Sequence, residues 1–456
     1  MRERFRSIDR QTPFILPPSI EDWLPEDHLS RFIVDIVEEL DLGAIQRAYS
    51  GRGEMAHNPK MLVALLFYGY ATGVFSSRKL ELATWESVAF RYVAANEHPD
   101  HDTIAHFRKR FLKELSALFV DILRIAHAMG VLKLGKVSLD WTKIHANASK
   151  HSALSWEHAC KIEEQLKAEV AELLRQAEKA DTEDLPDGYD IPEELRRREE
   201  RLAGIARAKA ELKRRAAERY EQEQSKYAKK VEARRAKEEE TGKKAKGREP
   251  KEPTPGVRAK DQINLTDDES RIMPQSGGGF EQSYNAQASV DTESLMVVGQ
   301  HVTQHPNDKE ELKPAVEVLE ALPEGLGTVS TILADAGYYS EENVDYCESA
   351  EHGIEPYISA GREGHNPKLQ ERFAEPEPLP NANDATPTER MKHRMKTPEG
   401  RAIYAKRKCT VEPVFGVIKA VLGFRQFLLR GLEAVSGEWA LVCMGWNLKR
   451  LHVMAK

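Results

Sequence analysis

The chain has 456 residues, of which 40% are hydrophobic and 31% are charged, and its formal net charge is −7 at pH 7. This length accommodates two or three domains with at least one sizeable core, and the composition predicts a globular protein with some solvated helical segments. The net charge by itself gives no sign of a nucleic-acid partner, but the charge is unevenly distributed. Residues 386–456 contain 14 Lys and Arg against 5 Asp and Glu, so the C-terminal region is basic.

Cysteine usage and hydropathy argue against several classes of protein. The four cysteines are widely spaced and form no C-x-x-C pair, which argues against a zinc knuckle or a disulfide framework and fits a reduced compartment. Residues 1–14 lack the apolar stretch of a signal peptide, and the longest apolar run, residues 61–75, is short for a membrane span. We therefore expect a cytoplasmic protein with no membrane partner.

Helical periodicity runs from residue 29 to about residue 130. Within it, Asp102 or Thr103 can cap a helix that buries Ile104, Phe107 and Phe111. The same helix is expected to expose His106, Arg108, Lys109, Arg110 and Lys113. Short helices followed by a capped, basic-faced helix are typical of helix-turn-helix DNA readers, whose later helix enters the major groove. We predict DNA contact by Arg108, Lys109 and Arg110, and the alternative is a helix face that is merely solvated.

The hydrophobic period changes at residues 136–145, KVSLDWTKIH, where alternating polar and apolar residues predict a strand that carries Asp140. Residues 153–240 are then rich in Glu, Lys, Arg and Ala, with apolar residues repeating at three and four. This pattern predicts an antiparallel coiled-coil hairpin, which we interpret as a solvated spacer inserted into another domain. Residues 238–260 predict an extended or disordered linker with a basic centre.

Strand patterns resume after the insertion. Residues 284–291 and 295–303 predict a hairpin, Asp308 can cap a following helix, and residues 328–334 predict a buried strand that ends at Asp335. Without the insertion, the order of elements predicts an α/β sheet of mixed direction flanked by helices. We therefore expect three domains: a helical N-terminal DNA-binding domain, 1–130; an α/β catalytic domain, 131–152 and 261–456; and a helical coiled-coil insertion with its linker, 153–260.

Residues 404–419, YAKRKCTVEPVFGVIK, place one carboxylate, Glu412, among cations and beside an apolar run. Pro413 fits the first turn of a helix, where its missing N–H costs nothing, so we expect Glu412 at the start of that helix. Lys419 would then lie roughly two turns further along the same face. An acid among bases beside a packed helix suits a metal site that acts on a polyanion. The alternative is a surface glutamate in a solvated basic turn.

Asp140, Asp335 and Glu412 are too far apart in the chain to form a sequence motif, but folding can bring them together. Acids at the carboxyl edge of a sheet lie where open α/β folds bind ligands. Three carboxylates without Cys or His suit Mg²⁺ or Mn²⁺, which keep waters and bind phosphate oxygens. Two such ions can activate a water or a 3′-hydroxyl for an in-line phosphoryl displacement. The alternatives are that Asp335 caps a turn and that Asp140 pairs with a basic residue.

Three segments together resemble the D…D…E signature of bacterial insertion-sequence DDE transposases, which have an RNase H-like catalytic core. The segments are VSLDWTKIHANAS, LADAGYYS and YAKRKCTVEPVFGVIK. Residues 58–81 and 98–111 are similar to the helical DNA-binding region that precedes that core. The resemblance covers most of the chain apart from much of the insertion.

The resemblance implies that Asp140, Asp335 and Glu412 are the catalytic residues and that they hold Mg²⁺ or Mn²⁺. It also implies metal-dependent cleavage of transposon DNA ends followed by strand transfer into target DNA. The partners would be double-stranded DNA and, in the synaptic complex, a second copy of the chain. A metal-dependent nuclease without strand transfer and a catalytically inert DNA-binding protein are the alternatives.

The family's Tyr-Arg-Glu-Lys pattern implies that Tyr404, Arg407 and Lys419 contact the DNA end. The spacing from Glu412 to Lys419 matches the pattern. Arg407 lies one residue further from Glu412 than usual, and Lys408 fits that spacing better. Both cations are therefore candidates for the phosphate contact.

Overall fold

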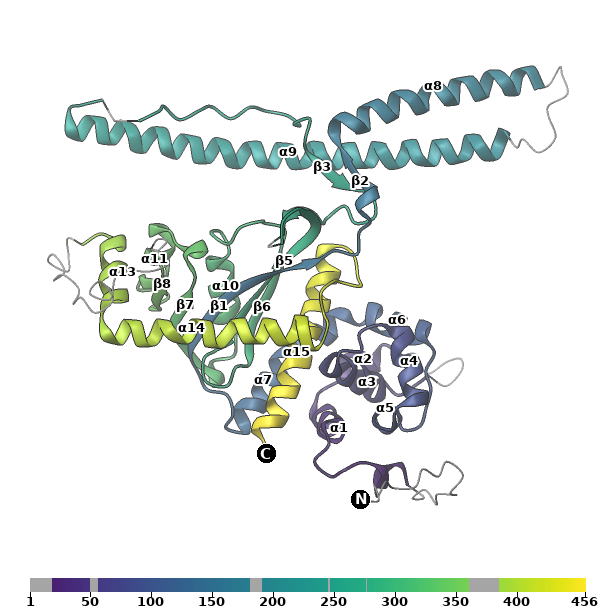
Figure 1. Cartoon of the computed structure of the whole chain (residues 1–456), viewed down its shortest axis with the longest axis vertical. Coiled ribbons are helices and arrows are strands. Elements are labelled where there is room, and N and C mark those ends of the chain that lie inside the picture. The colour runs from purple at the N-terminus through teal and green to yellow at the C-terminus, as the bar shows by residue number, and fades with distance from the viewer. Residues whose placement is uncertain (1–18, 50–55, 181–190, 245–246, 276, 361–384) are drawn as a thin grey trace, which may run out of the picture. The chain divides into compact units, whose positions relative to one another are not determined.

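The computed structural model describes residues 19–49, 56–180, 191–244, 247–275, 277–360 and 385–456. The chain divides into two compact units, the first formed by residues 1–144, 285–429 and 433–456 and the second by residues 145–284 and 430–432. The first contains the N-terminal helices and the second the two long helices of the insertion (Figure 1). The three-domain division stays a prediction. Across the described residues, no helix is both long enough and apolar enough to cross a membrane.

The N-terminal part of the first unit is helical, as the periodicity predicts. Its described helices are a 3₁₀ helix (Ile20–Trp23), α1 (Leu29–Glu39), α2 (Gly43–Arg47), α3 (Pro59–Thr72), α4 (Ser77–Glu86), α5 (Val88–Val93), α6 (His101–Arg110) and α7 (Leu112–Ala128). α3 begins at Pro59, which fits the first turn of a helix, with the Asn58 side chain accepting a hydrogen bond from the Lys60 N–H. It ends at Gly73, whose φ of 84° favours glycine and where an added Cβ would lie 2.6 Å from the Leu422 carbonyl oxygen.

A mixed sheet runs in the order β4-β5-β1-β7-β8, with β6 paired to β5. Its strands are β1 (Leu134–His145), β4 (Arg271–Pro274), β5 (Phe280–Asp291), β6 (Val297–Thr303), β7 (Gly327–Ala334) and β8 (Glu355–Ile358). β1 with β7 and β7 with β8 are parallel pairs, whereas β4 with β5 and β5 with β6 are antiparallel. The mixed sheet expected from the sequence is therefore confirmed.

Helices from the C-terminal half flank this sheet. They are α10 (Leu312–Glu320), α11 (Glu341–Glu348), α13 (Pro387–Lys396), α14 (Pro398–Gly416), a π-helical turn (Val417–Val421) and α15 (Leu432–Met454). Most side chains of α15 are buried, as its apolar sequence on all sides requires. The Trp439 indole N–H donates to the Gln287 carbonyl of β5 at 2.9 Å, and the Asn447 amide binds both the N–H and the C=O of Val297 in β6.

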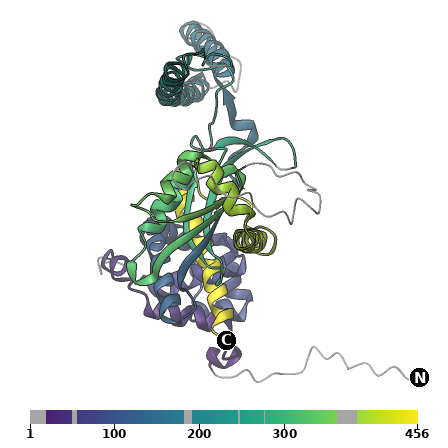
Figure 2. The ribbon, with the colours of Figure 1, turned by 90° about the vertical axis from the view of Figure 1, so that its left-hand side faces the viewer.

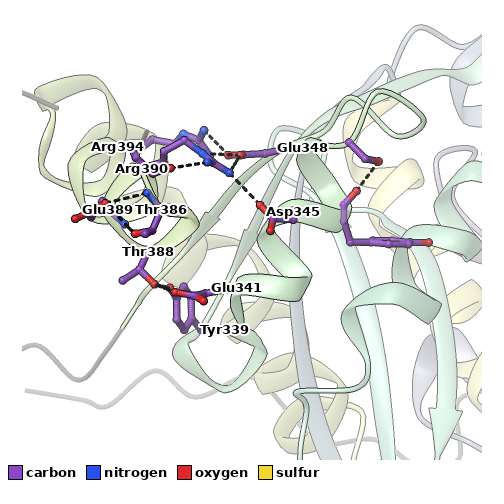
Figure 3. Close-up of polar contacts among 12 residues, drawn as sticks. Tyr339, Glu341, Asp345, Glu348, Thr386, Thr388, Glu389, Arg390 and Arg394 are labelled. Atoms are coloured by element: carbon purple, nitrogen blue, oxygen red, sulfur yellow. Dashed lines mark hydrogen bonds and ion pairs between the residues drawn. The ribbon is translucent and has the colours of Figure 1, made fainter. Parts of the chain in front are cut away.

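A network of charged side chains fixes α13 against α11 (Figure 3). Arg390 and Arg394 both donate to the Glu348 carboxylate, at 2.9 and 2.6 Å, and Arg390 also donates to Asp345 at 3.0 Å. Arg394 additionally donates to the Pro356 carbonyl of β8 at 2.7 Å. Because α13 leads directly into α14, this network fixes the place where α14 begins.

In the second unit, α8 (Trp156–Ala180) and α9 (Ile191–Thr241) lie side by side (Figures 1 and 2). They share a buried apolar seam with the adjoining strands, formed by Leu154, Ala159, Leu166, Ile205, Ala208, Leu212 and Ile263. The short antiparallel pair of β2 (Ala153–Ser155) and β3 (Gln262–Asn264) joins the two ends of the insertion. The expected helices are thus present, a coiled-coil supercoil stays a prediction, and the connection at 181–190 lies outside the described residues.

Candidate active site

The sheet brings Asp140, within β1, and Asp335, directly after β7, to matching positions. β1 and β7 run parallel, with Ser138 opposite Leu333. Asp140 and Asp335 each lie two residues beyond this pair, so the same register places them opposite each other. The two acids therefore meet at the carboxyl end of β7, the side on which open α/β sheets bind ligands.

Asp140 occupies a largely desolvated position within β1. Its side chain is 15% exposed, its Oδ1 accepts a hydrogen bond from the Trp141 N–H at 2.9 Å, and its Oδ2 lies 3.7 Å from an Arg407 guanidinium nitrogen. The pKa of Asp140 is raised to about 6. Burial is the main cause and the charges of Asp335 and Glu412 add to it, whereas the Trp141 N–H and Arg407 oppose the shift. Asp140 thus lies within electrostatic range of both other acids.

Asp335 follows β7 directly and caps the short 3₁₀ helix Ala336–Tyr338. Its Oδ1 accepts a hydrogen bond from the Gly337 N–H at 2.7 Å, so the capping role left open by the sequence is real. Capping uses only part of the acceptor capacity of a carboxylate. An added Cβ at Gly337 would lie 2.9 Å from this Oδ1, so the glycine keeps the space beside Asp335 open.

Glu412 lies near the end of a long helix and not at the start of a short one. α14 begins at Pro398, where the Thr397 side chain accepts a backbone hydrogen bond. The expectation that Pro413 opens a helix is therefore wrong, because the Thr-Pro start signal earlier in the chain begins the helix. Pro413 has no N–H to donate within α14. The π turn Val417–Val421 follows directly after the last residue of α14, Gly416.

Arg407 lies between two of the acids. Its guanidinium nitrogens are 3.7 Å from Oδ2 of Asp140 and 3.5 Å from Oε1 of Glu412, and its side chain is 12% exposed. Its Nε is buried without a hydrogen-bond partner, and its Cζ lies 5.9 Å from the centre of the Tyr404 ring. Lys408 is exposed. Arg407 therefore faces the acids, although Lys408 fits the sequence spacing better.

Lys419 ties the end of α14 to the strand that carries Asp140. It lies in the π turn, and its ammonium donates to the Lys143 carbonyl of β1 at 2.8 Å. Burial lowers the pKa of Lys419, and the charges of Arg425 and Lys143 lower it further. This hydrogen bond helps to hold β1 at a constant distance from α14.

Two family models match the chain. A model described as "Transposase DDE domain" matches residues 253–448, and one described as "Transposase domain (DUF772)" matches residues 18–110. The chain belongs to the insertion-sequence DDE transposases. No curated protein and no solved structure gives a significant match. The DDE match contains Asp335 and Glu412, whereas Asp140 lies outside both matched segments. The pairing of β1 with β7 in the transposase sheet places Asp140 opposite Asp335.

In the transposase domain at residues 18–110, Arg108 points inward. It is 5% exposed and donates to the Tyr70 hydroxyl at 3.2 Å and to the Phe75 carbonyl at 2.9 Å. Tyr70 in turn donates to Oε1 of the fully buried Glu438 at 3.4 Å, and Oε2 of Glu438 accepts two backbone N–H groups. The expected exposure of Arg108 is therefore wrong, because the fold supplies a buried carboxylate that the local helical pattern cannot reveal.

The other two cations predicted on this helix are exposed. Lys109 has no hydrogen-bonded or ion-paired partner within the described part of the transposase, whereas Arg110 donates to the Ala48 carbonyl at 2.7 Å. The cap of α6 is Asp100, which accepts from the Thr103 N–H at 2.7 Å, so the expected cap at Asp102 or Thr103 is wrong by a small shift. The exposed basic face is thus narrower than the sequence suggests.

The donor set fits a hard divalent cation, although it does not form a closed cage. Among the described residues, no group of three His, Cys, Asp or Glu side chains is placed to hold a metal ion. Mg²⁺ usually binds one or two carboxylates together with waters and substrate phosphates, and it prefers oxygen ligands. The aligned pair Asp140 and Asp335 meets this requirement, and Gly337 leaves space beside it.

Asp308 is a further acid in this region, and the sequence predicted that it caps a helix. That expectation is wrong, because α10 has Glu311 at its N-cap position and the Asp308 Oδ1 instead accepts from the side-chain amides of Asn285 and Gln287, at 3.2 and 3.4 Å. The pKa of Asp308 is raised to about 7. Burial is the main cause and the charges of Asp335 and Asp140 add to it, whereas the two amides oppose the shift. In the sequence, the amides Asn285 and Gln287 at alternate positions of the strand predicted at residues 284–291 indicate that a polar side chain packs against them.

Proposed function

We propose that this transposase cleaves DNA at transposon ends and transfers the freed strand into target DNA. In the first step, a water oxygen bonds to phosphorus while the P–O3′ bond breaks, which leaves a 3′-hydroxyl and a 5′-phosphate. In the second step, that 3′ oxygen bonds to a target phosphorus while one target P–O3′ bond breaks, so the number of phosphodiester bonds is conserved. The observation that carries the proposal is the alignment of Asp140 with Asp335, together with the Arg407 bridge from Asp140 to Glu412.

Asp140, Asp335 and Glu412 are the proposed catalytic residues and the proposed ligands of Mg²⁺ or Mn²⁺. A divalent ion bound there would stabilise charge on the phosphoryl oxygens and lower the pKa of a bound water. The distances of 3.5 and 3.7 Å from Arg407 to two of these carboxylates exceed those of a good hydrogen bond. A stronger ligand for the carboxylates therefore displaces the guanidinium at little cost.

The cations of α14 support binding of the DNA end. A guanidinium matches a phosphate in a bidentate manner, so we assign the phosphate nearest the acids to Arg407 and the flanking backbone to the exposed Lys408. The Tyr404 ring beside the guanidinium restricts its orientation. Lys419 is a further proposed DNA-end contact, and its hydrogen bond to the Lys143 carbonyl holds β1 beside α14.

The exposed cations of α6 support DNA binding by the N-terminal helices. Lys109 and Arg110 would contact the backbone, whereas the buried Arg108 would not. Each phosphate neutralised by such a cation contributes about −0.9 to the slope of log K against log salt on B-DNA. Synapsis of two DNA ends calls for two copies of the chain, so the proposed working form is a homodimer on double-stranded DNA.

Isosteric replacement of the acids tests the proposed reaction. Asp140→Asn, Asp335→Asn and Glu412→Gln should each lower cleavage and strand transfer about 1,000-fold or more, because metal-assisted charge stabilisation supplies several kcal/mol. DNA affinity should be retained, since none of the three contacts phosphate directly. A labelled transposon-end duplex with a plasmid target in Mg²⁺ measures nicks and joined products in one reaction.

The matched control is Glu399→Gln, because Glu399 is an exposed glutamate in the first turn of the same helix, α14. An equal loss of activity in this variant, or full strand transfer by any of the three acid variants, would contradict the assignment. Nicks without joined products from the wild-type protein would favour a metal-dependent nuclease. A lack of Mg²⁺-dependent cleavage would favour an inert DNA-binding protein.

A further inference from the structure

The connection between β6 and α10 carries a buried carboxylate with one unused oxygen. Asp308 is 5% exposed, and its Oδ1 accepts hydrogen bonds from Asn285 and Gln287. Within the described residues, no group donates a hydrogen bond to its Oδ2. A carboxylate oxygen without a donor can bind a cation, and a bound cation also offsets the cost of burying the charge of Asp308.

The unused oxygen faces Asp335 across Gly337. An added Cβ at Gly337 would lie 3.1 Å from Oδ2 of Asp308 and 2.9 Å from Oδ1 of Asp335, so both carboxylates border the same small space. The φ of Gly337 is not positive, so the backbone conformation does not require glycine there. What the missing side chain provides is the space between the two acids.

The amides that hold Asp308 are themselves fixed. Gln287 donates to the Asn285 Oδ1 at 3.0 Å, the Tyr338 hydroxyl donates to the Gln287 Oε1, and the Trp439 indole donates to the Gln287 carbonyl. These contacts point the amide N–H groups at Oδ1 of Asp308 and leave Oδ2 turned towards Asp335. Outer contacts of this kind orient the carboxylates that bind metal ions.

We propose that Asp308 and Asp335 form a divalent-cation subsite, so that the acidic centre of this transposase contains four carboxylates. The inference rests on the proposed function, because Asp335 is both a proposed catalytic residue and a proposed ligand of this subsite. Mg²⁺ or Mn²⁺ held by two carboxylates keeps positions for waters and for phosphate oxygens. The Lys143 ammonium, which lies within electrostatic range of Asp308, is the competing cation when no metal is bound.

Binding of Mn²⁺ to the full-length, DNA-free protein tests the subsite without relying on activity. The electron paramagnetic resonance signal of free Mn²⁺ reports the bound fraction during a titration. Asp308→Asn should weaken Mn²⁺ binding about 10-fold or more. The matched control is Asp291→Asn, because Asp291 is 2% exposed and its Oδ2 accepts only from its own turn, so wild-type affinity is expected. Wild-type affinity in Asp308→Asn would overturn the subsite.

Gly337→Ala is the second variant, because it retains every carboxylate and fills the space between two of them. It should also weaken Mn²⁺ binding, whereas Gly325→Ala, where an added Cβ meets nothing within 4 Å, should bind as the wild type does. Thermal unfolding confirms that each variant is folded. Undiminished Mn²⁺ affinity in Gly337→Ala would equally overturn the subsite.

DNA cleavage by the same proteins separates the two proposals. Loss of both Mn²⁺ binding and cleavage in Asp335→Asn, with neither lost in Asp308→Asn, would overturn the subsite and leave the proposed reaction standing. Weakened Mn²⁺ binding in Asp308→Asn, with no cleavage by the wild type, would support the subsite and overturn the proposed reaction.

Discussion

Two arginines of the first unit each face carboxylates, but their surroundings differ. Arg108 is 5% exposed and donates at 3.2 Å to Tyr70, which leads to the fully buried Glu438. Arg407 approaches Glu412 only to 3.5 Å, and the side chain of that glutamate is 53% exposed. In the first cluster, hydrogen bonds connect the guanidinium to the carboxylate through Tyr70, although Nε of Arg108 lacks a partner among the described residues. In the second, the distances from Arg407 to the carboxylates are longer.

We expect this difference to separate a structural cluster from the proposed catalytic one. A buried charge destabilises the fold unless partners surround it, so the residues around Arg108 have little freedom to exchange partners. Burial, and after it the charges of Asp335 and Glu412, raise the pKa of Asp140, and such perturbed pKa values are common at functional sites. The comparison predicts a ranking of mutational effects.

The largest loss of stability is expected for Arg108→Met. Removal of the guanidinium leaves the buried Glu438 without its countercharge, so the free energy of unfolding should fall by about 3–5 kcal/mol. Urea unfolding followed by circular dichroism measures this change. Lys109→Met, at the next position of α6, is exposed and should shift the free energy of unfolding by no more than about 0.5 kcal/mol. Equal effects of the two substitutions on the free energy of unfolding would contradict a structural role for Arg108.

The network around Glu348 should give an intermediate loss. Glu348 and Arg394 are each 20% exposed and Arg390 is 30% exposed, so water screens these ion pairs in part. Glu348→Ala should lower the free energy of unfolding by about 1–2 kcal/mol. The same urea titration measures it, with the exposed Glu351→Ala as the control. A loss larger than that of Arg108→Met would break the ranking.

Arg407→Gln should change stability by less than about 1 kcal/mol, because its contacts are long and one partner is exposed. Its effect should fall on DNA, where the salt dependence of binding to a transposon-end duplex should lose about one unit of slope. Fluorescence anisotropy at several NaCl concentrations measures this slope. Arg124→Gln, an exposed arginine on α7, is the control. An unchanged slope together with a large loss of stability would make Arg407 a structural residue like Arg108.

Thiol labelling should perturb the protein least, and it compares an exposed position near Arg407 with buried positions elsewhere in the first unit. Cys409 is exposed on α14, whereas Cys347 and Cys443 are buried and burial raises the pKa of both thiols, that of Cys347 to about 12. Iodoacetamide should therefore modify Cys409 first, as mass spectrometry of timed samples would show. Bound transposon-end DNA should slow this reaction. Faster modification of Cys347 than of Cys409 would contradict the described burial.

Local patterns predicted those elements whose signals lie among neighbouring residues. β7 ends just before Asp335, and β5 and β6 pair as the hairpin predicted for residues 284–291 and 295–303. Caps and strand ends depend on hydrogen bonds within a few residues, so the sequence carries them directly.

Local signals failed where a distant segment supplied a stronger partner. Arg108 was predicted on the solvent-exposed face of its helix but is buried, because Glu438, on the last helix, balances its charge. Asp308 binds two amides of β5 instead of capping α10. Pro413 lies inside a helix that an earlier Thr-Pro signal begins. In each case the deciding contact involves residues that no local window contains.

By itself, the amino-acid sequence determined the family, because its motifs resemble one family. It also predicted a site for hard cations, because three carboxylates without Cys or His suit such ions. Only the tertiary structure decided that Asp140 lies opposite Asp335, that Arg407 and not Lys408 faces the acids, and that Asp308 stands beside them. Strand register and the phase of a long helix depend on packing between segments far apart in the chain, which local patterns do not encode.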